Sequence, residues 1–191
     1  IDDGKPLVSD LIPTTPTIRY FSCPEKMRVG KKRNLACELA RGDIIVHWDD
    51  DDWQAPDRLS RQVKALKTAQ ADICGLDRMF FIQTNGQKAW EYVYSSPNTR
   101  WLAGGSLCYR RHIWRERPFE NVTSGEDSLF VWSLPTQRLL ALDDQDITIA
   151  RVHANNTSPK KSSGPAWRPI SPKLILDITK YAWPAGPNNI S

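Results

Sequence analysis

Four consecutive aspartates, residues 49–52, are the feature of this sequence most able to do chemistry. They follow a short apolar segment, Asp43 to Trp48, that is predicted to be a strand. Ligands of α/β proteins bind at the carboxyl ends of strands, and like charges packed there cost stability unless a cation or ligand offsets the repulsion. Because hard oxygen ligands suit Mg²⁺ and Mn²⁺, the run predicts a divalent-cation site. The alternatives are a solvated acidic turn or a calcium loop.

Two predicted helices flank this strand and would hold the acidic run in place. The first begins near Lys31, and Gly42 is expected to end it in a left-handed cap. The second follows Pro56, which suits a first helical turn. The apolar residues at helical spacing are Leu35 and Leu39 in the first helix and Leu59, Val63 and Leu66 in the second.

The rest of the chain predicts one α/β unit with a mixed sheet and no linker between domains. Residues 5–24 read as loop with one short strand over 17–22, and residues 160–169 as a mobile loop. Asn85-Gly86 is a strong hairpin signal between strands over 73–83 and 88–95. Further strands are expected over 102–109, 138–142 and 146–153, and helices over 111–117 and 124–135. A last helix from Ser171-Pro172 would turn Leu174, Ile175, Ile178 and Tyr181 inward.

Composition excludes several classes of protein. The 191 residues, 40% hydrophobic and 25% charged, match an ordinary globular domain with its own core. A net charge of +4 fits anionic ligands such as phosphates without demanding nucleic acid. The four cysteines are far apart and form no CxxC pair, so we expect neither a zinc module nor a disulfide scaffold, but a reducing cytoplasm. The apolar runs are far shorter than the roughly 20 residues that span a bilayer.

Several motifs, taken in order along the chain, resemble the family 2 glycosyltransferases of the GT-A fold. The first are Asp2-Asp3-Gly4, Gly30 with Arg33-Asn34-Leu35-Ala36, and Ala40-Arg41-Gly42-Asp43. The acidic run follows as Trp48-Asp49-Asp50-Asp51-Asp52-Trp53 with Pro56-Asp57-Arg58-Leu59. The later ones are Gly104-Gly105-Ser106-Leu107-Cys108-Tyr109-Arg110-Arg111, like the family's acceptor-side strand, Gly125-Glu126-Asp127, like its ED motif, and Arg151-Val152-His153 with Asn156-Thr157-Ser158. The ordered set covers residues 1–158 and is more specific than any one motif.

This resemblance implies a fold and a reaction. The fold would be the nucleotide-diphospho-sugar transferase type, a mixed central sheet flanked by helices. It would form one catalytic domain over residues 1–191, with a nucleotide-sugar and metal half (1–100) and an acceptor half (101–191). The reaction would be a hexosyltransferase-like transfer, with inversion, from a nucleotide-diphosphate sugar to a glycan or lipid-linked acceptor hydroxyl. A UDP-sugar is the expected donor, and Mn²⁺ or Mg²⁺ the expected cofactor.

The resemblance also implies roles for the donor-side residues, aligned on Pro56-Asp57-Arg58-Leu59. Asp51 would bind the metal, which neutralises charge on the leaving nucleotide. The residues placed at the donor are Asp49 at the start of the motif, Asp50 near the ribose, Asp2 and Asp3 at the base, and Arg33 and Asn34 near the nucleotide. Lys160, Lys161 and Arg168 would close over the diphosphate, unless they form a solvated basic loop.

Inversion needs a base that takes the proton of the attacking hydroxyl. Asp127, with Glu126 beside it, is the candidate, although a helix dipole alone would favour two carboxylates in a first turn. His153 would complete the metal site or act only as a hydrogen-bonding residue, whereas His47 is expected to be structural.

The acceptor side is expected to include Gly105 and Trp53. The indole of Trp53 would stack on a sugar ring, against the general expectation that a tryptophan packs in a core.

The family pattern has a strand, a helix and a second strand before the Asp-Asp-Gly turn with which this sequence begins. We therefore expect the first strand and helix to be missing here, which would expose sheet edges and favour self-association. The resemblance suggests polysaccharide or lipid-linked glycan synthesis at the inner face of a bacterial membrane, with peripheral membrane association and no nucleic acid. Two other classes stay open: a non-catalytic nucleotide- or glycan-binding relative, and a metal-dependent phosphotransfer or hydrolytic enzyme.

Overall fold

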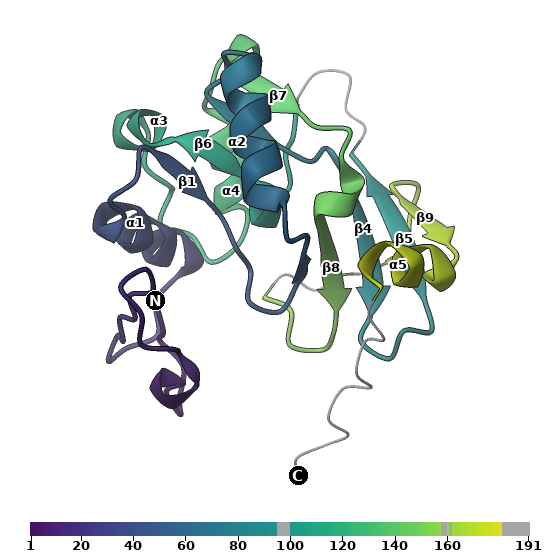
Figure 1. Cartoon of the computed structure of the whole chain (residues 1–191), viewed down its shortest axis with the longest axis horizontal. Coiled ribbons are helices and arrows are strands. Elements are labelled where there is room, and N and C mark those ends of the chain that lie inside the picture. Colours follow the sequence, from purple (N-terminus) through teal and green to yellow (C-terminus); the bar gives the residue numbers. More distant parts are fainter. Residues whose placement is uncertain (95–99, 158–159, 161, 181–191) are drawn as a thin grey trace.

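The computed structural model describes residues 1–94, 100–157, 160 and 162–180, in which two mixed sheets are flanked by helices (Figure 1). The helices are α1 (Val29–Leu39), α2 (Arg58–Thr68), α3 (Arg111–Glu116), α4 (Glu126–Trp132) and α5 (Pro172–Thr179). The strands are β1 (Ile44–Val46), β2 (Trp53–Gln54), β3 (Ile73–Gly75), β4 (Arg78–Gln83), β5 (Ala89–Val93), β6 (Cys108–Arg110), β7 (Leu139–Ala141), β8 (Thr148–Val152) and β9 (Trp167–Ile170). The α/β class and most predicted elements are confirmed.

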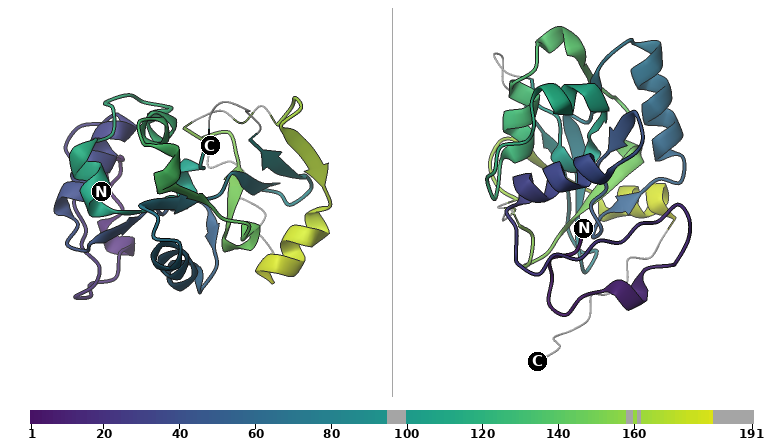
Figure 2. Two further views of the ribbon diagram at one scale, coloured as in Figure 1. Left: turned by 90° about the horizontal axis from the view of Figure 1, so that it is seen from above. Right: turned by 90° about the vertical axis from the view of Figure 1, so that its left-hand side faces the viewer.

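The first sheet has the strand order β1-β6-β3-β7 and is covered on both faces. Only the β3–β7 pair is parallel. Since neighbouring residues of a strand point to opposite faces, Ile73 and Tyr109 enter a core with α1, α3 and α4. Cys74 and Cys108 enter a second core with Leu66 of α2. The helices on the two faces are visible in Figure 2.

The second sheet has the order β2-β8-β4-β5-β9 and lies beside the first (Figure 1). The predicted hairpin is confirmed, since β4 and β5 pair antiparallel and Gly86 adopts a φ of +70° in the turn. The second core contains Met79 and Phe81 of β4 together with Cys74 and Cys108, so both sheets share it. Helix α5 covers the outer face of β4 through Ile175, which is fully buried.

The expectation of a single sheet with one strand over 73–83 is wrong in detail. The chain leaves the first sheet after β3 and enters the second at β4. At the crossing, the backbone N–H of Leu76 donates to Ser106 Oγ over 2.8 Å, and its carbonyl accepts from Ala103 N–H over 2.8 Å. These two bonds satisfy the backbone N–H and carbonyl of Leu76, which has no strand partner, and they connect the crossing to residues 103–106.

Four further segments differ from the structure predicted for them. Helix α1 ends at Leu39 with Ala40 extended, and Gly42 has no positive φ, so the predicted left-handed cap is wrong. Residues 167–169 of the predicted loop form β9 together with Ile170, because this segment pairs with β5. Residues 17–22 form no strand, only one bridge between Asp2 and Ser22. In α5 Leu174 is 43% exposed instead of turned inward; Tyr181 lies outside the described residues.

Helix α2 buries Leu66 and packs Val63 against the second core, as predicted, but it also buries two polar residues in place of Leu59. Its buried residues are Arg58, Gln62 and Leu66, spaced four apart, whereas Leu59 is 49% exposed. No helix among the described residues combines the length and apolarity needed to cross a bilayer.

Candidate active site

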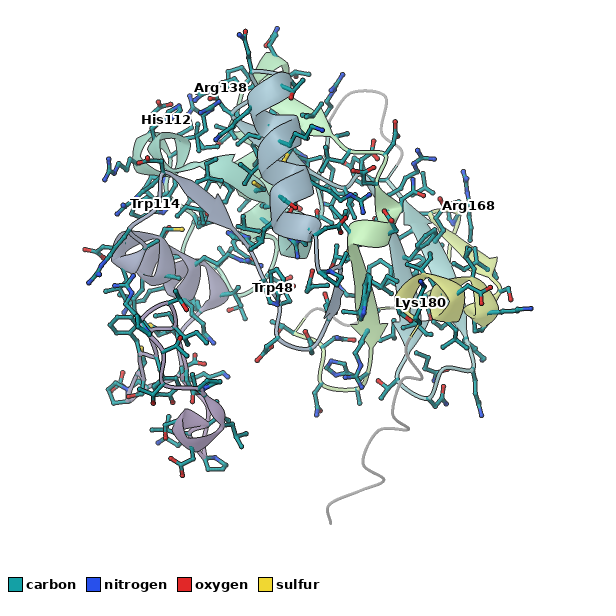
Figure 3. All side chains as sticks on the ribbon, viewed as in Figure 1. Trp48, His112, Trp114, Arg138, Arg168 and Lys180 are labelled. Atoms are coloured by element: carbon teal, nitrogen blue, oxygen red, sulfur yellow. The ribbon has the colours of Figure 1, made fainter. Side chains whose placement is uncertain are left out.

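A cleft of about 840 Å³ lies where α1, the acidic run and the two sheets meet. Its wall also includes the start of α4, the end of β8 and a single 3-10 turn, Gly104–Ser106. The predicted site residues that line it are Arg33, Asp49, Asp50, Asp51, Gly105, Glu126 and Asp127. Trp48, the residue before the acidic run, lies between the two sheets in Figure 3. Residues predicted from distant motifs are thus brought together around one cavity.

The four aspartates of the acidic run occupy different environments. Asp50 is exposed. Burial raises the pKa of Asp49, with Asp51 and Asp50 adding to the effect and Arg33 opposing it. Burial also raises the pKa of Asp52 to about 7, helped by Asp49 and Asp51 and opposed by the N–H of Arg151, which donates to Asp52 Oδ1 over 2.9 Å. The acidic run is therefore a partly buried cluster rather than a solvated turn.

The turn Gly104-Gly105 separates this acidic run from Asp127. A Cβ at Gly104 would lie 2.2 Å from Asp127 Oδ2, and a Cβ at Gly105 would lie 2.5 Å from Asp49 Oδ2. Each glycine thus gives one carboxylate the room to approach the backbone. Gly105, predicted on the acceptor side, lies between the two carboxylate groups.

Arg58 holds the acidic run against this glycine turn, a role that sequence reasoning missed. Its side chain is fully buried, and its Nη2 donates to the carbonyls of His47 and Gly105, each over 2.9 Å. Nε donates to Gln62 Oε1 over 2.9 Å, and Nη1 donates to Gln54 Oε1. The signal was present, because Arg58 stands in the Pro56-Asp57-Arg58-Leu59 motif with Gln62 one helical turn later.

Arg33 lies among the carboxylates on the other side of the cleft. Its Nε donates to Glu126 Oε1 over 2.9 Å, and its Nη1 lies 2.6 Å from His47 Nδ1. Burial opposes the charge of Arg33, but Asp49, Glu126 and Asp127 outweigh it and raise its pKa. Because Glu126 is only 4% exposed and paired with Arg33, it orients this end of α4, and Asp127 is the carboxylate free to face the cleft.

His47 is buried, as predicted for a structural residue. Its Nε2 lies 3.0 Å from the Tyr109 hydroxyl, which in turn lies 3.1 Å from Cys37 Sγ. Burial first, and Arg33 next, lower the pKa of His47 well below its ordinary value. The imidazole is therefore neutral and acts as a connection between Arg33 and the core.

Asp51 and His153, the predicted metal ligands, are in contact, with 2.7 Å between Oδ2 and Nε2. His153 Nδ1 lies 3.2 Å from the backbone nitrogen of Asn155, and Nε2 also lies 3.1 Å from Asn156 Nδ2, so ligation of a metal through Nε2 would replace its contact with Asn156. No group of three His, Cys, Asp or Glu side chains among the described residues could hold a metal ion. A cation of the Mg²⁺ or Mn²⁺ type at this pair would have to take its remaining ligands from water and substrate phosphates.

Asp2, Asp3 and Asn34 do not line the cleft. Asp2 accepts the Tyr20 hydroxyl, which lowers its pKa to about 2, and Asp3 accepts Met27 N–H and pairs with Lys32. Asn34 Nδ2 donates to the carbonyl of Phe119, and Asn34 Oδ1 accepts from Phe119 N–H and from Trp114 Nε1, each over 2.9 Å. These side chains hold the segments around α1 together.

Trp53 and Arg168 also lie away from the cleft. Trp53 packs against the core under α5, and Arg168 lies on β9, remote from Trp48 in Figure 3. Of the basic residues predicted to cover the diphosphate, Lys160 lines the cleft, and Lys161 lies outside the described residues.

Comparison with solved structures supports the fold. S. aureus TarS 1-349 superposes with a TM-score of 0.52 at 19% identity, covering 69% of this chain and 42% of that one. The UDP complex of the same protein gives 0.53 at 21% identity, with 69% and 42% covered. Its UDP-GlcNAc complex gives 0.55 at 19% identity, with 83% and 47% covered. The chain thus spans less than half of these structures, and their likeness confirms the predicted GT-A fold.

A comparison with curated proteins gives no match. The family model "Glycosyl transferase family 2" matches residues 1–123, more than half of the chain. That stretch contains the acidic run, Arg58 and the Gly104-Gly105 turn. The chain therefore belongs to glycosyl transferase family 2.

Proposed function

We propose that this chain is a glycosyltransferase catalytic domain that binds a nucleoside-diphosphate sugar in the cleft and transfers the sugar to an acceptor hydroxyl with inversion. The observation that carries the proposal is the Gly104-Gly105 turn, with Asp127 against Gly104 and Asp49 against Gly105. It provides an acidic donor side and a separate carboxylate within one cavity.

In the proposed reaction, Asp127 takes the proton of the acceptor hydroxyl while its oxygen attacks the anomeric carbon. The bond between that carbon and the diphosphate oxygen breaks, and the nucleoside diphosphate leaves on the opposite face. Arg33 and Glu126 set the position of Asp127, and Arg58 sets that of the acidic run. Arg33 pairs with Glu126, and no ion pair of Asp127 is among those described, so we propose that its carboxylate faces the cleft as the base.

Asp51 and His153 are the residues that we propose to hold Mn²⁺ or Mg²⁺. When bound, the cation would neutralise charge that develops on the leaving diphosphate. We further propose a UDP-sugar as donor, because the TarS relatives crystallise with UDP and UDP-GlcNAc, and a glycan or lipid-linked acceptor at the cytoplasmic membrane face.

The test is calorimetric titration of the chain with UDP and with GDP, each with and without Mn²⁺. We expect Mn²⁺-dependent UDP binding that Asp51→Ala abolishes. Asp143→Ala is the matched control, because the Asp143 side chain is 95% exposed and lies outside the cleft, and it should bind UDP as the unchanged chain does.

Product analysis separates the rival classes. Intact sugar on an acceptor supports the transferase, free phosphate supports a phosphotransfer or hydrolytic enzyme, and UDP binding without any turnover supports a non-catalytic relative. A folded chain that binds neither nucleotide would contradict the proposed donor site.

A further inference from the structure

Trp101 lines the cleft and is held rigidly by its neighbours. Tyr94 stacks on its indole, with ring centroids 5.2 Å apart and 28° between the planes. Tyr92 meets it edge-on at 5.5 Å and 69°. The indole Nε1 donates to Ser128 Oγ over 3.1 Å. Two aromatic contacts and one hydrogen bond thus fix the orientation of a ring that would otherwise be free to rotate.

The same hydrogen bond places Trp101 beside the proposed base. Ser128 follows Asp127 in α4, and its backbone N–H donates to Asp127 Oδ1 over 2.7 Å. A base has to lie within hydrogen-bond reach of the hydroxyl that it deprotonates. An acceptor sugar whose hydroxyl reaches Asp127 would thus enter the part of the cleft that Trp101 lines.

The cleft is acidic on one side and apolar on the other. Asp49 and Asp52 approach the Gly105 side of the glycine turn, whereas the half-buried Trp101 offers apolar surface to the same cavity, with the buried side chains of Met79 and Phe81 behind it. A pyranose ring combines an apolar C–H face with hydroxyl groups at its rim. Aromatic walls with a few fixed polar groups are the usual way to bind such a ligand.

Trp53, the tryptophan expected to stack on the acceptor, cannot take this part in the observed arrangement. It packs against the core that contains Phe80 and Ile82 and does not line the cleft. Trp101 has what Trp53 lacks, namely access to the cavity and a bonded path to Asp127.

We propose that Trp101, with Phe81 and Met79 beside it, forms the acceptor subsite and binds a pyranose ring whose hydroxyl points to Asp127. This inference rests on the proposed function and adds the position and chemical class of the acceptor.

The test is saturation-transfer NMR with three probes: methyl β-D-glucopyranoside, methyl β-D-galactopyranoside and methyl N-acetyl-β-D-glucosaminide. The chain is saturated with UDP and Mn²⁺. We expect transfer to the ring protons of at least one probe and a loss of about fivefold in Trp101→Leu, the size of a lost aromatic contact. Trp53→Leu is the matched control and should keep the signal.

A second variant keeps the test valid if Trp101→Leu fails to fold. Trp101→Phe preserves an aromatic face but not the bond to Ser128, so it should keep at least about half of the transfer. Calorimetric UDP binding monitors folding and the donor site in every variant. The inference is overturned if the unchanged chain binds UDP but none of the probes, or if Trp101→Leu keeps the full signal. Failure of UDP binding itself would instead count against the proposed function.

Discussion

The Gly104→Ala substitution tests the central geometry of the site. The added Cβ would lie 2.2 Å from Asp127 Oδ2, whereas ordinary contact begins at 3.4 Å, so the carboxylate must move by the difference, 1.2 Å. Displacing a reacting group by about 1 Å can lower a rate by about a hundredfold. We expect that loss in turnover, measured as UDP released from UDP-sugars, with UDP affinity nearly unchanged.

Three other glycines give the prediction its controls. Gly105→Ala would place its Cβ 2.5 Å from Asp49 Oδ2, so it displaces Asp49 and should weaken UDP binding instead. Gly30→Ala places its Cβ 1.8 Å from the carbonyl oxygen of Glu120 and should destabilise the fold, which thermal unfolding would detect. Gly42→Ala meets nothing closer than 3.4 Å and should behave as the unchanged chain does.

A Gly104→Ala variant with turnover within about threefold of the unchanged chain would refute this prediction, because the added Cβ requires Asp127 to move. The added Cβ would also lie 2.8 Å from Asp127 Cβ, which rotation of the side chain does not move, so the first turn of α4 has to shift. We therefore expect a stability cost of about 1–3 kcal/mol, which thermal unfolding would measure.

Four further predictions concern the site, the N-terminal segment and the sheet edges. Arg58→Lys leaves the buried carbonyls of His47 and Gly105 short of donors, so it should lower the free energy of unfolding in denaturant by about 2–4 kcal/mol. Leu59→Ala, at the exposed neighbouring residue, should cost under about 0.5 kcal/mol, and equal costs would contradict the structural role given to Arg58. Asp127→Asn should lower turnover by at least about a hundredfold with UDP affinity nearly unchanged; near-normal turnover removes it as the base. The Tyr20 hydroxyl lowers the pKa of Asp2 to about 2, so this bond stabilises the fold above pH 3.8 and its contribution is lost as the pH falls towards 2. Over that range Tyr20→Phe should lose less stability than the unchanged chain, and parallel curves of unfolding free energy against pH would argue against the bond. Self-association through a sheet edge stays a prediction, and a strictly monomeric mass by light scattering would count against it.

Local patterns of the sequence determined the elements that carry the site. Apolar spacing and a proline predicted α1 and α2, the Asn-Gly pair predicted the β4–β5 hairpin, and the acidic run was placed correctly after β1. These predictions succeed because helix periodicity and turn conformation depend on residues within a few positions of one another. The ordered motifs also indicated the family, which the match over residues 1–123 confirms.

Only the tertiary structure decided how these elements meet. An exposed Leu59 and a buried Arg58 reverse the expectation from apolarity, because carbonyls of His47 and Gly105, 11 and 47 residues away, offer Arg58 its partners. The same holds for Trp101, whose place in the site depends on a hydrogen bond to a residue 27 positions later. Propensity describes what a residue prefers locally. Burial and function depend on which distant groups surround it, and that information arises only when two sheets and their helices pack together.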